Sequence, residues 1–210
     1  MIFKICGLKT KESLLCCEKN NADFFGMIFY EKSPRNITFN EAETLISISK
    51  ELKIKPVGVF SDHEINDLEQ IISSLGLKHI QLHGNEDQSY IDQIKKQFDV
   101  KIIKKISINN SEDLSEINKF ENIEYLLFDY KPVNNELPGG NSKSFDWNLL
   151  KGQRIKLPWF ISGGINETNI KKIQDLLNPN GIDLSSGVEV SKGIKNNSKI
   201  NNLFKKFYDN

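Results

Sequence analysis

Two residues of this sequence, Cys6 and Asp129, have the types and positions that acid–base chemistry requires. Cys6 ends a short apolar run and is followed by Gly7, so its sulfur could face a substrate cavity at the end of that run. A thiolate serves as a general base when its pKa is lowered; the alternative is a small buried core residue. Asp129 directly follows the apolar run 126–128, where a carboxylate is costly unless it is solvated, paired or functional. Partial desolvation raises the pKa of a carboxyl group, which suits a general acid.

Two further side chains could hold a charged or polar substrate. Arg35 lies in the loop Lys32-Ser33-Pro34-Arg35, which its proline stiffens. A guanidinium in such a loop could grip a carboxylate with two parallel hydrogen bonds. His83 is followed by Gly84, which allows the backbone to approach a ligand closely. The alternatives are a solvated surface charge for Arg35 and a structural role for His83.

The elements that position these residues can be predicted from apolar runs that alternate with amphipathic stretches. Short continuous apolar runs suit strands buried on both faces, as in parallel sheets. The eight runs are Ile2–Cys6, Phe24–Tyr30, Val57–Phe60, His79–Leu82, Ile102–Ile106, Tyr125–Phe128, Trp159–Ile161 and Ile182–Leu184. Helices are predicted at Thr10–Lys19, Asn40–Leu52, Glu64–Leu75, Glu86–Phe98, Ser111–Phe120, Phe145–Leu150, Asn166–Leu177 and Ser198–Tyr208.

Strict alternation of eight strands with eight helices predicts an α/β fold, a closed (β/α)8 TIM barrel that forms a single domain over residues 1–210. An open doubly wound sheet is the alternative, although it usually has fewer strands. In a barrel the functional groups gather at the carboxyl ends of the strands, and the loops after strands seven and eight often bind phosphate. Those loops contain Gly163-Gly164 and Ser185-Ser186. We therefore expect these four residues to bind a phosphorylated substrate, the alternative being ordinary tight turns.

Composition excludes several classes of protein. The 28 basic and 28 acidic residues balance, which gives no long-range attraction for nucleic acid. The hydrophobic fraction of 38% is too high, and the net charge too low, for a disordered chain. No stretch reaches the ~18 consecutive apolar residues of a membrane-spanning helix, and the N-terminal run is too short for a signal-peptide core. We expect a cytoplasmic protein with a small-molecule phosphorylated substrate and no membrane or nucleic-acid partner.

Sequence motifs for metals, nucleotide cofactors and disulfides are missing. The cysteines Cys6, Cys16 and Cys17 form no CxxC pair, which agrees with a reducing compartment. The three histidines lack a metal-ligand spacing, and no glycine-rich nucleotide motif is present. We therefore expect neither a metal nor a cofactor.

The motifs at the strand ends resemble those of the phosphoribosylanthranilate isomerase family of tryptophan biosynthesis, in the same order. The resemblance runs from residue 2 to about residue 195. It rests on Lys4-Ile5-Cys6-Gly7, Gly26-Met27-Ile28-Phe29 with Lys32-Ser33-Pro34-Arg35, Gln81-Leu82-His83-Gly84, Gly139-Gly140 with Phe145-Asp146-Trp147, Ser162-Gly163-Gly164-Ile165-Asn166, and Asp183 with Ser185-Ser186-Gly187-Val188-Glu189.

The resemblance implies a cofactor-free Amadori rearrangement of N-(5-phosphoribosyl)anthranilate to 1-(2-carboxyphenylamino)-1-deoxyribulose 5-phosphate. It implies that Cys6 is the general base and Asp129 the general acid. Arg35, His83 and Asp183 would bind the substrate, Arg35 through the anthranilate carboxylate. The two loops that contain Gly-Gly and Ser-Ser would hold the phosphate.

Two alternatives to this function stay open at the level of sequence. The isomerase of histidine biosynthesis catalyses the same rearrangement, but it generally carries an aspartate where this chain has Cys6. A catalytically silent phosphate-binding barrel would need neither the acid nor the base. The chain departs from the family at Asn141-Ser142, where a further glycine is usual, so we expect that loop to close differently. A monomer is expected rather than a homodimer, because no helix has an obvious second apolar face.

Overall fold

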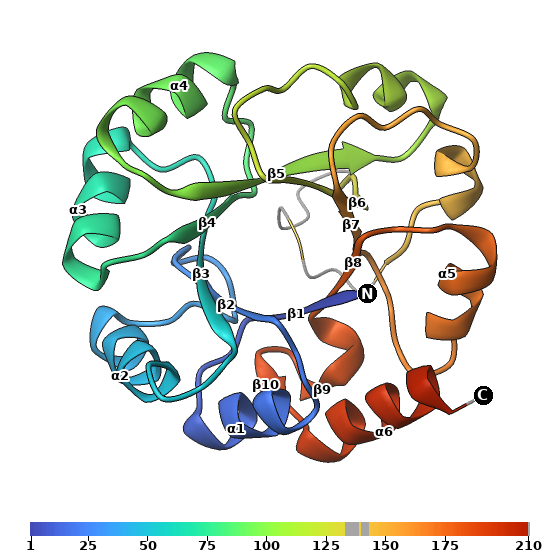
Figure 1. Cartoon of the computed structure of the whole chain (residues 1–210), viewed down its shortest axis with the longest axis horizontal. Coiled ribbons are helices and arrows are strands. Elements are labelled where there is room, and N and C mark those ends of the chain that lie inside the picture. The colour runs from blue at the N-terminus through green and yellow to red at the C-terminus, as the bar shows by residue number, and fades with distance from the viewer. Residues whose placement is uncertain (133–138, 140–142, 210) are drawn as a thin grey trace.

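The computed structural model describes residues 1–132, 139 and 143–209, and its main feature is a closed barrel of eight parallel strands (Figure 1). Each strand pairs with the next in chain order, and β8 returns to pair with β1. This confirms the predicted (β/α)8 barrel and excludes the open sheet. The strands are β1 (Ile2–Cys6), β2 (Phe24–Ile28), β3 (Lys55–Phe60), β4 (His79–Leu82), β5 (Lys101–Ile108), β6 (Tyr125–Tyr130), β7 (Trp159–Ile161) and β8 (Gly181–Leu184).

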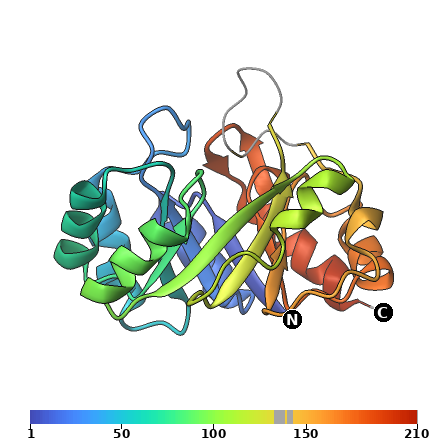
Figure 2. The same cartoon turned by 90° about the horizontal axis from the view of Figure 1, so that it is seen from above.

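Helices cover the outside of the barrel, as Figures 1 and 2 show from two directions. They are α1 (Lys11–Lys19), α2 (Phe39–Ser49), α3 (Ile65–Leu75), α4 (Gln88–Gln97), α5 (Ile170–Leu176) and α6 (Asn197–Tyr208). Within the described ranges, no helix combines the length and the apolar character that crossing a bilayer would require.

Two of the predicted α-helices are wrong. The stretch Ser111–Phe120 forms only the short 3-10 helix η1 (Ser111–Glu116), and Phe145–Leu150 forms only η2 (Trp147–Leu150). In η1 the Asn110 side chain accepts from the backbone N–H groups of residues 112 and 113, and the Asp113 carboxylate accepts from those of 109 and 110. Such local bonds compete with the helical i→i−4 ladder.

A two-stranded hairpin after β8 was not predicted. It consists of β9 (Glu189–Ser191) and β10 (Ile194–Lys195), and it follows the 3-10 helix η3 (Ser186–Val188). The turn depends on Gly193, whose φ of +86° favours glycine, and a Cβ there would collide with the Pro34 carbonyl oxygen. The hairpin is therefore seated against the loop that follows β2 and contains Arg35.

The apolar core has two parts that are separated by the wall of the barrel. The larger cluster fills the space between strands and helices, whereas a smaller one fills the barrel interior. Neighbouring residues of a strand point to opposite sides of this wall, so on β6 Leu126 and Phe128 belong to the outer cluster and Leu127 to the inner one. Inward-facing positions that are polar are Lys4 on β1, Gln81 on β4, Lys105 on β5, Asp129 on β6 and Asp183 on β8.

Removing an aromatic side chain from α6 tests whether this last helix belongs to the same cooperative unit as the barrel. The Phe204 ring is 2% exposed, and its centroid lies 4.8 Å from that of Phe3 on β1. We expect Phe204→Ala to lower the free energy of unfolding by about 3–5 kcal/mol, because the change leaves a cavity. Urea unfolding followed by circular dichroism measures this, and it should show one transition. The exposed neighbour Lys205→Ala serves as the control, with a change within about 0.5 kcal/mol.

If Phe204→Ala has the stability of the wild type, or if α6 unfolds in a separate earlier transition, then this helix is not part of the barrel's cooperative unit.

Candidate active site

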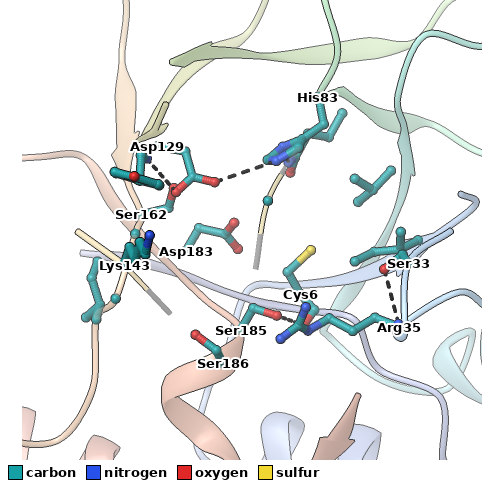
Figure 3. A pocket seen from close by; sticks show the side chains of 18 of the residues that line it. Cys6, Ser33, Arg35, His83, Asp129, Lys143, Ser162, Asp183, Ser185 and Ser186 are labelled. Atoms are coloured by element: carbon teal, nitrogen blue, oxygen red, sulfur yellow. Dashed lines mark hydrogen bonds and ion pairs between the residues drawn. The ribbon is translucent and has the colours of Figure 1, made fainter. Parts of the chain in front are cut away.

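All nine residues predicted to form the site line one cavity at the carboxyl ends of the strands (Figure 3). The cavity opens to solvent and, with the solvent space at its entrance included, has a volume of about 840 Å³. The predicted residues in it are Cys6, Arg35, His83, Asp129, Gly163, Gly164, Asp183, Ser185 and Ser186. Gly140 and the Asn141-Ser142 departure lie outside the described residues.

Cys6 ends β1 at the bottom of this cavity, and its side chain is buried. Burial raises the pKa of the Cys6 thiol above its usual value. Lys4 and Lys195 act in the opposite direction, and Asp183 adds to the increase. The sequence argument required a lowered pKa for a thiolate base, whereas the unliganded site favours the protonated thiol. Any thiolate that reacts is therefore a minority form at neutral pH.

Asp129, on β6, lies across the cavity from Cys6. Its Oδ1 accepts from the backbone N–H of Tyr130 at 2.8 Å, and its Oδ2 lies 3.6 Å from His83 Nε2. Burial raises the pKa of Asp129, although nearby Lys105 and the hydrogen bonds from Tyr130 and Ser162 oppose the change. The direction is the one that its place after three bulky apolar residues predicts. A carboxyl group that keeps its proton to higher pH can act as a general acid.

The Gln81 side-chain amide holds the His83 ring in place, with 2.8 Å between the amide and His83 Nδ1. Where the amide nitrogen donates to Nδ1, the neutral ring carries its proton on Nε2, the atom that faces Asp129. Sequence reasoning missed Gln81, although its place two residues before His83 on β4 puts both side chains on the same face of the strand.

Asp183, on β8, forms a buried ion pair that sequence reasoning did not foresee. Lys4 Nζ donates to Asp183 Oδ1 at 2.9 Å, and the Lys4 side chain is fully buried. The two residues are partners in the register between β1 and β8. The Asp183 carboxylate lies between Cys6 and Asp129 in the cavity, and burial raises its pKa while Lys4 opposes the rise. The signal that was missed is the spacing of Lys4 and Cys6, which puts both on the inner face of β1.

Arg35 is not the solvated surface charge that was one alternative, because only 2% of its surface is exposed. Its Nε and Nη2 donate to the two Glu189 carboxylate oxygens at 2.7 and 2.8 Å. Glu189 also accepts from Lys195 at 2.7 Å. Burial opposes ionisation of Glu189, but these two cations lower its pKa. The cluster of two cations and one carboxylate carries a net positive charge at the cavity wall.

The loops after β7 and β8 are packed against each other. Gly163 and Gly164 have φ values of +87° and +65°, a backbone conformation that favours glycine. A Cβ on Gly187 would collide with the carbonyl oxygen of Ile165, so this glycine lets the two loops meet. The Ser185 hydroxyl donates to the Cys6 carbonyl oxygen at 3.0 Å and accepts from Lys195 at 3.2 Å. The loops thus line one side of the cavity with backbone and hydroxyl groups.

Comparisons with known proteins show which family the chain is similar to. The family model described as N-(5'phosphoribosyl)anthranilate (PRA) isomerase matches residues 3–206. The N-(5'-phosphoribosyl)anthranilate isomerase of Zymomonas mobilis is 41% identical over 199 residues, 94% of this chain and 93% of that protein. The protein of the same name from Rhizobium johnstonii is 38% identical, with 96% of this chain and 91% of that protein covered.

Solved structures are similar over almost the whole chain. Monomers generated from the dimeric phosphoribosylanthranilate isomerase of Thermotoga maritima have a TM-score of 0.83 and 29% identity, with 98% of each chain covered. Another solved isomerase of this kind, in complex with reduced 1-(o-carboxyphenylamino)-1-deoxyribulose 5-phosphate, has a TM-score of 0.81 and 29% identity, again with 98% of each chain covered.

Proposed function

This chain belongs to the N-(5'-phosphoribosyl)anthranilate isomerase family, and we propose that it performs the family's reaction with Cys6 as general base and Asp129 as general acid. It is an aldose–ketose isomerase of tryptophan biosynthesis. The reaction converts N-(5'-phosphoribosyl)anthranilate to 1-(2-carboxyphenylamino)-1-deoxyribulose 5-phosphate by an Amadori rearrangement. The observation that carries the assignment of roles is that a buried thiol and a buried carboxyl group face one another across a single cavity.

The first chemical step needs an acid at the furanose ring oxygen. Asp129 holds its proton to higher pH than an exposed aspartate because it is buried. It donates that proton to the ring oxygen, the bond from the ring oxygen to C1 breaks, and the nitrogen lone pair forms a protonated imine at C1. The N–H of His83, which faces Oδ2, stabilises the carboxylate that results.

The second step needs a base at C2 of the opened sugar. The protonated imine acidifies the C2 hydrogen because the electron pair of the C–H bond can move toward the cationic nitrogen. The Cys6 thiolate takes this proton and an enolamine forms. The enolamine then takes a proton at C1 from the Cys6 thiol and gives its C2 hydroxyl proton to the Asp129 carboxylate, which yields the aminoketone and restores both groups. Asp129 and Cys6 return to their starting protonation states, and no electrons enter or leave the substrate.

Two positively biased regions suit the two anionic ends of the substrate. The Arg35–Glu189–Lys195 cluster carries net positive charge, and we assign the anthranilate carboxylate to Arg35. The phosphate is assigned to the loops of Gly163-Gly164 and Ser185-Ser186, which line the same cavity. His83 and Asp183, between them, are assigned to the sugar hydroxyls and ring.

Three further expectations stay predictions. The protein is proposed to act as one domain over residues 1–210, as a monomer, and in the cytoplasm. The expectation of a monomer is not supported by every relative, because one similar structure is of monomers derived from a dimeric isomerase. Sedimentation of the purified chain measures the oligomeric state directly.

Loss of turnover in Cys6→Ala tests the base. With N-(5'-phosphoribosyl)anthranilate generated in situ and followed by its fluorescence, the wild type should remove it faster than spontaneous hydrolysis. We expect Cys6→Ala to lower kcat by about 10²–10⁴-fold, the usual contribution of one acid–base group, with little change in the urea midpoint. Cys16→Ala, which changes a cysteine of α1 outside the cavity, is the matched control and should keep full turnover.

A Cys6→Ala variant with near-wild-type kcat would remove the thiol from the mechanism. A wild type that accelerates nothing would contradict the proposal as a whole.

The pH dependence of kcat/KM tests the acid and base together. The reactive form of the enzyme has Asp129 protonated and Cys6 ionised. Burial raises the pKa of both groups. Between the two pKa values the dominant form is the opposite one, with Asp129 ionised and Cys6 protonated. Between these two pKa values the fraction with Asp129 protonated falls with pH as fast as the fraction with Cys6 ionised grows, so the wild-type profile should be flat over that range. Asp129→Asn removes one titration, and its residual kcat/KM should rise about tenfold per pH unit as thiolate forms. A flat residual profile in Asp129→Asn would contradict the assignment.

Arg35→Met tests the carboxylate contact. Loss of the guanidinium should raise KM about tenfold or more and affect kcat less, because binding of the carboxylate end is the same in the ground state and the transition state. Lys32→Met, an exposed cation in the same loop, is the control and should leave KM unchanged. Equal KM values in the two variants would show that Arg35 serves only to hold Glu189.

A further inference from the structure

Lys4 is a fully buried lysine in the interior of the barrel, and the reaction described above gives it no role. Its ammonium has a carboxylate partner, Asp183, at 2.9 Å, and both groups lie on inward-facing positions of paired strands. Removing a charge from water is costly, and an ammonium has three protons to donate. The pKa of Lys4 is nevertheless raised, since Asp183 and Cys6 outweigh the effect of burial. Lys4 therefore stays cationic beneath the active-site cavity.

The ammonium of Lys4 and the sulfur of Cys6 approach the same point inside the barrel. The two residues are two apart on β1 and share its inner face, so the charge of one acts on the other. The point of convergence is Gly26 on β2, the register partner of Cys6. A Cβ added there would lie 2.8 Å from Cys6 Sγ and 3.3 Å from Lys4 Nζ. The absence of a side chain at residue 26 is what leaves room for the two groups to meet.

We propose that Lys4, held in place by Asp183, is a positioning residue that fixes the Cys6 sulfur at the floor of the cavity and stabilises its thiolate form. The proposal rests on the role of Cys6 as the base. No proton is transferred to Lys4, which is already an ammonium ion. Its contribution is a fixed positive charge close to the sulfur, which stabilises the negatively charged thiolate and not the neutral thiol.

Three charged groups face Cys6 from the elements packed against it. Lys4 lies on β1, Asp183 on β8 and Lys195 on β10. Lys4 has the largest effect of the three on the Cys6 pKa, and Lys195 has the smallest. Lys195 is committed to Glu189 and to Ser185, at 2.7 and 3.2 Å. Lys4 is thus the cation that acts most directly on the sulfur.

The test is the pH dependence of Cys6 alkylation in the unliganded full-length protein. Iodoacetamide reacts with the thiolate, and mass spectrometry of peptides separates Cys6 from the Cys16–Cys17 pair. Removing a nearby opposite charge shifts a pKa by about one unit or more, so Lys4→Met should slow Cys6 alkylation about tenfold or more at pH 8. Asp183, left without its cation, is expected to take up a proton in Lys4→Met. Its negative charge then no longer raises the pKa of Cys6, but this effect is smaller than the loss of the Lys4 charge.

A second buried lysine provides a matched control. Lys105 is also inward-facing and buried, but it lies on β5 and acts on Asp129 rather than on Cys6. Lys105→Met also removes a buried positive charge from the barrel interior, but it should leave the pH profile of Cys6 alkylation unchanged. If Lys4→Met and Lys105→Met give the same Cys6 profile, Lys4 has no specific effect on the sulfur and the proposal is overturned.

Gly26→Ala is a second test in case Lys4→Met does not fold. It keeps every charged group and fills only the space beside the Cys6 sulfur and the Lys4 ammonium. The added methyl group separates the sulfur from the ammonium, and Cys6 alkylation at pH 8 should again slow, with kcat/KM reduced in step. Wild-type alkylation in a folded Gly26→Ala would count against the proposal. Failure of the base assignment would look different: Cys6→Ala would keep its turnover whatever the alkylation profile of Lys4→Met.

Discussion

The barrel closes where β1 pairs with β8, and at this seam Lys4 and Asp183 face each other inside the closed sheet. Lys4 is fully buried there and Asp183 is 8% exposed, so each stabilises the charge of the other. Breaking a buried pair by removing one partner costs about 3–5 kcal/mol. Cys6 is two residues beyond Lys4 on the same strand face. The pairing of β1 with β8 therefore also places the Lys4 ammonium and the Asp183 carboxylate next to Cys6 at the floor of the active-site cavity.

The same principle, a buried charge that is held by a partner from a distant part of the chain, recurs at Arg35 and, through His83, at Asp129. Glu189 of the β9–β10 hairpin fixes the Arg35 fork, and Lys195 completes that cluster. Asp129 is oriented by the Tyr130 backbone N–H and faced by His83. Such pairs restrict rotamers before substrate arrives, which lowers the entropic cost of reaching a reactive geometry. Burial also raises the pKa of both Asp129 and Cys6. Only a small fraction of the enzyme therefore has the protonation states that react, but in that fraction the two groups are already in position.

The sequence predicted the strands well because a strand buried on both faces leaves a continuous apolar run, as at Trp159–Ile161. It also predicted which residues face the cavity, because the fold brings all carboxyl ends of the strands together. It did not predict the partners that hold them. Lys4 and Asp183 are 179 residues apart, and Arg35 and Glu189 are 154 apart, so no local pattern links them. The helix expected at Ser111–Phe120 failed because side chains of Asn110 and Asp113 compete for the backbone N–H groups that a helix would use.

The arrangement of acid, base and anion sites is tested most directly by a crystal structure of this protein with reduced 1-(o-carboxyphenylamino)-1-deoxyribulose 5-phosphate. The account predicts the carboxylate of the analogue on Arg35, its phosphate between the loops of Gly163-Gly164 and Ser185-Ser186, and Cys6 Sγ and the Asp129 carboxyl on either side of the sugar chain, with the sulfur directed at C2. A ligand bound in the reverse direction, or one with C2 turned away from the Cys6 sulfur, would contradict it.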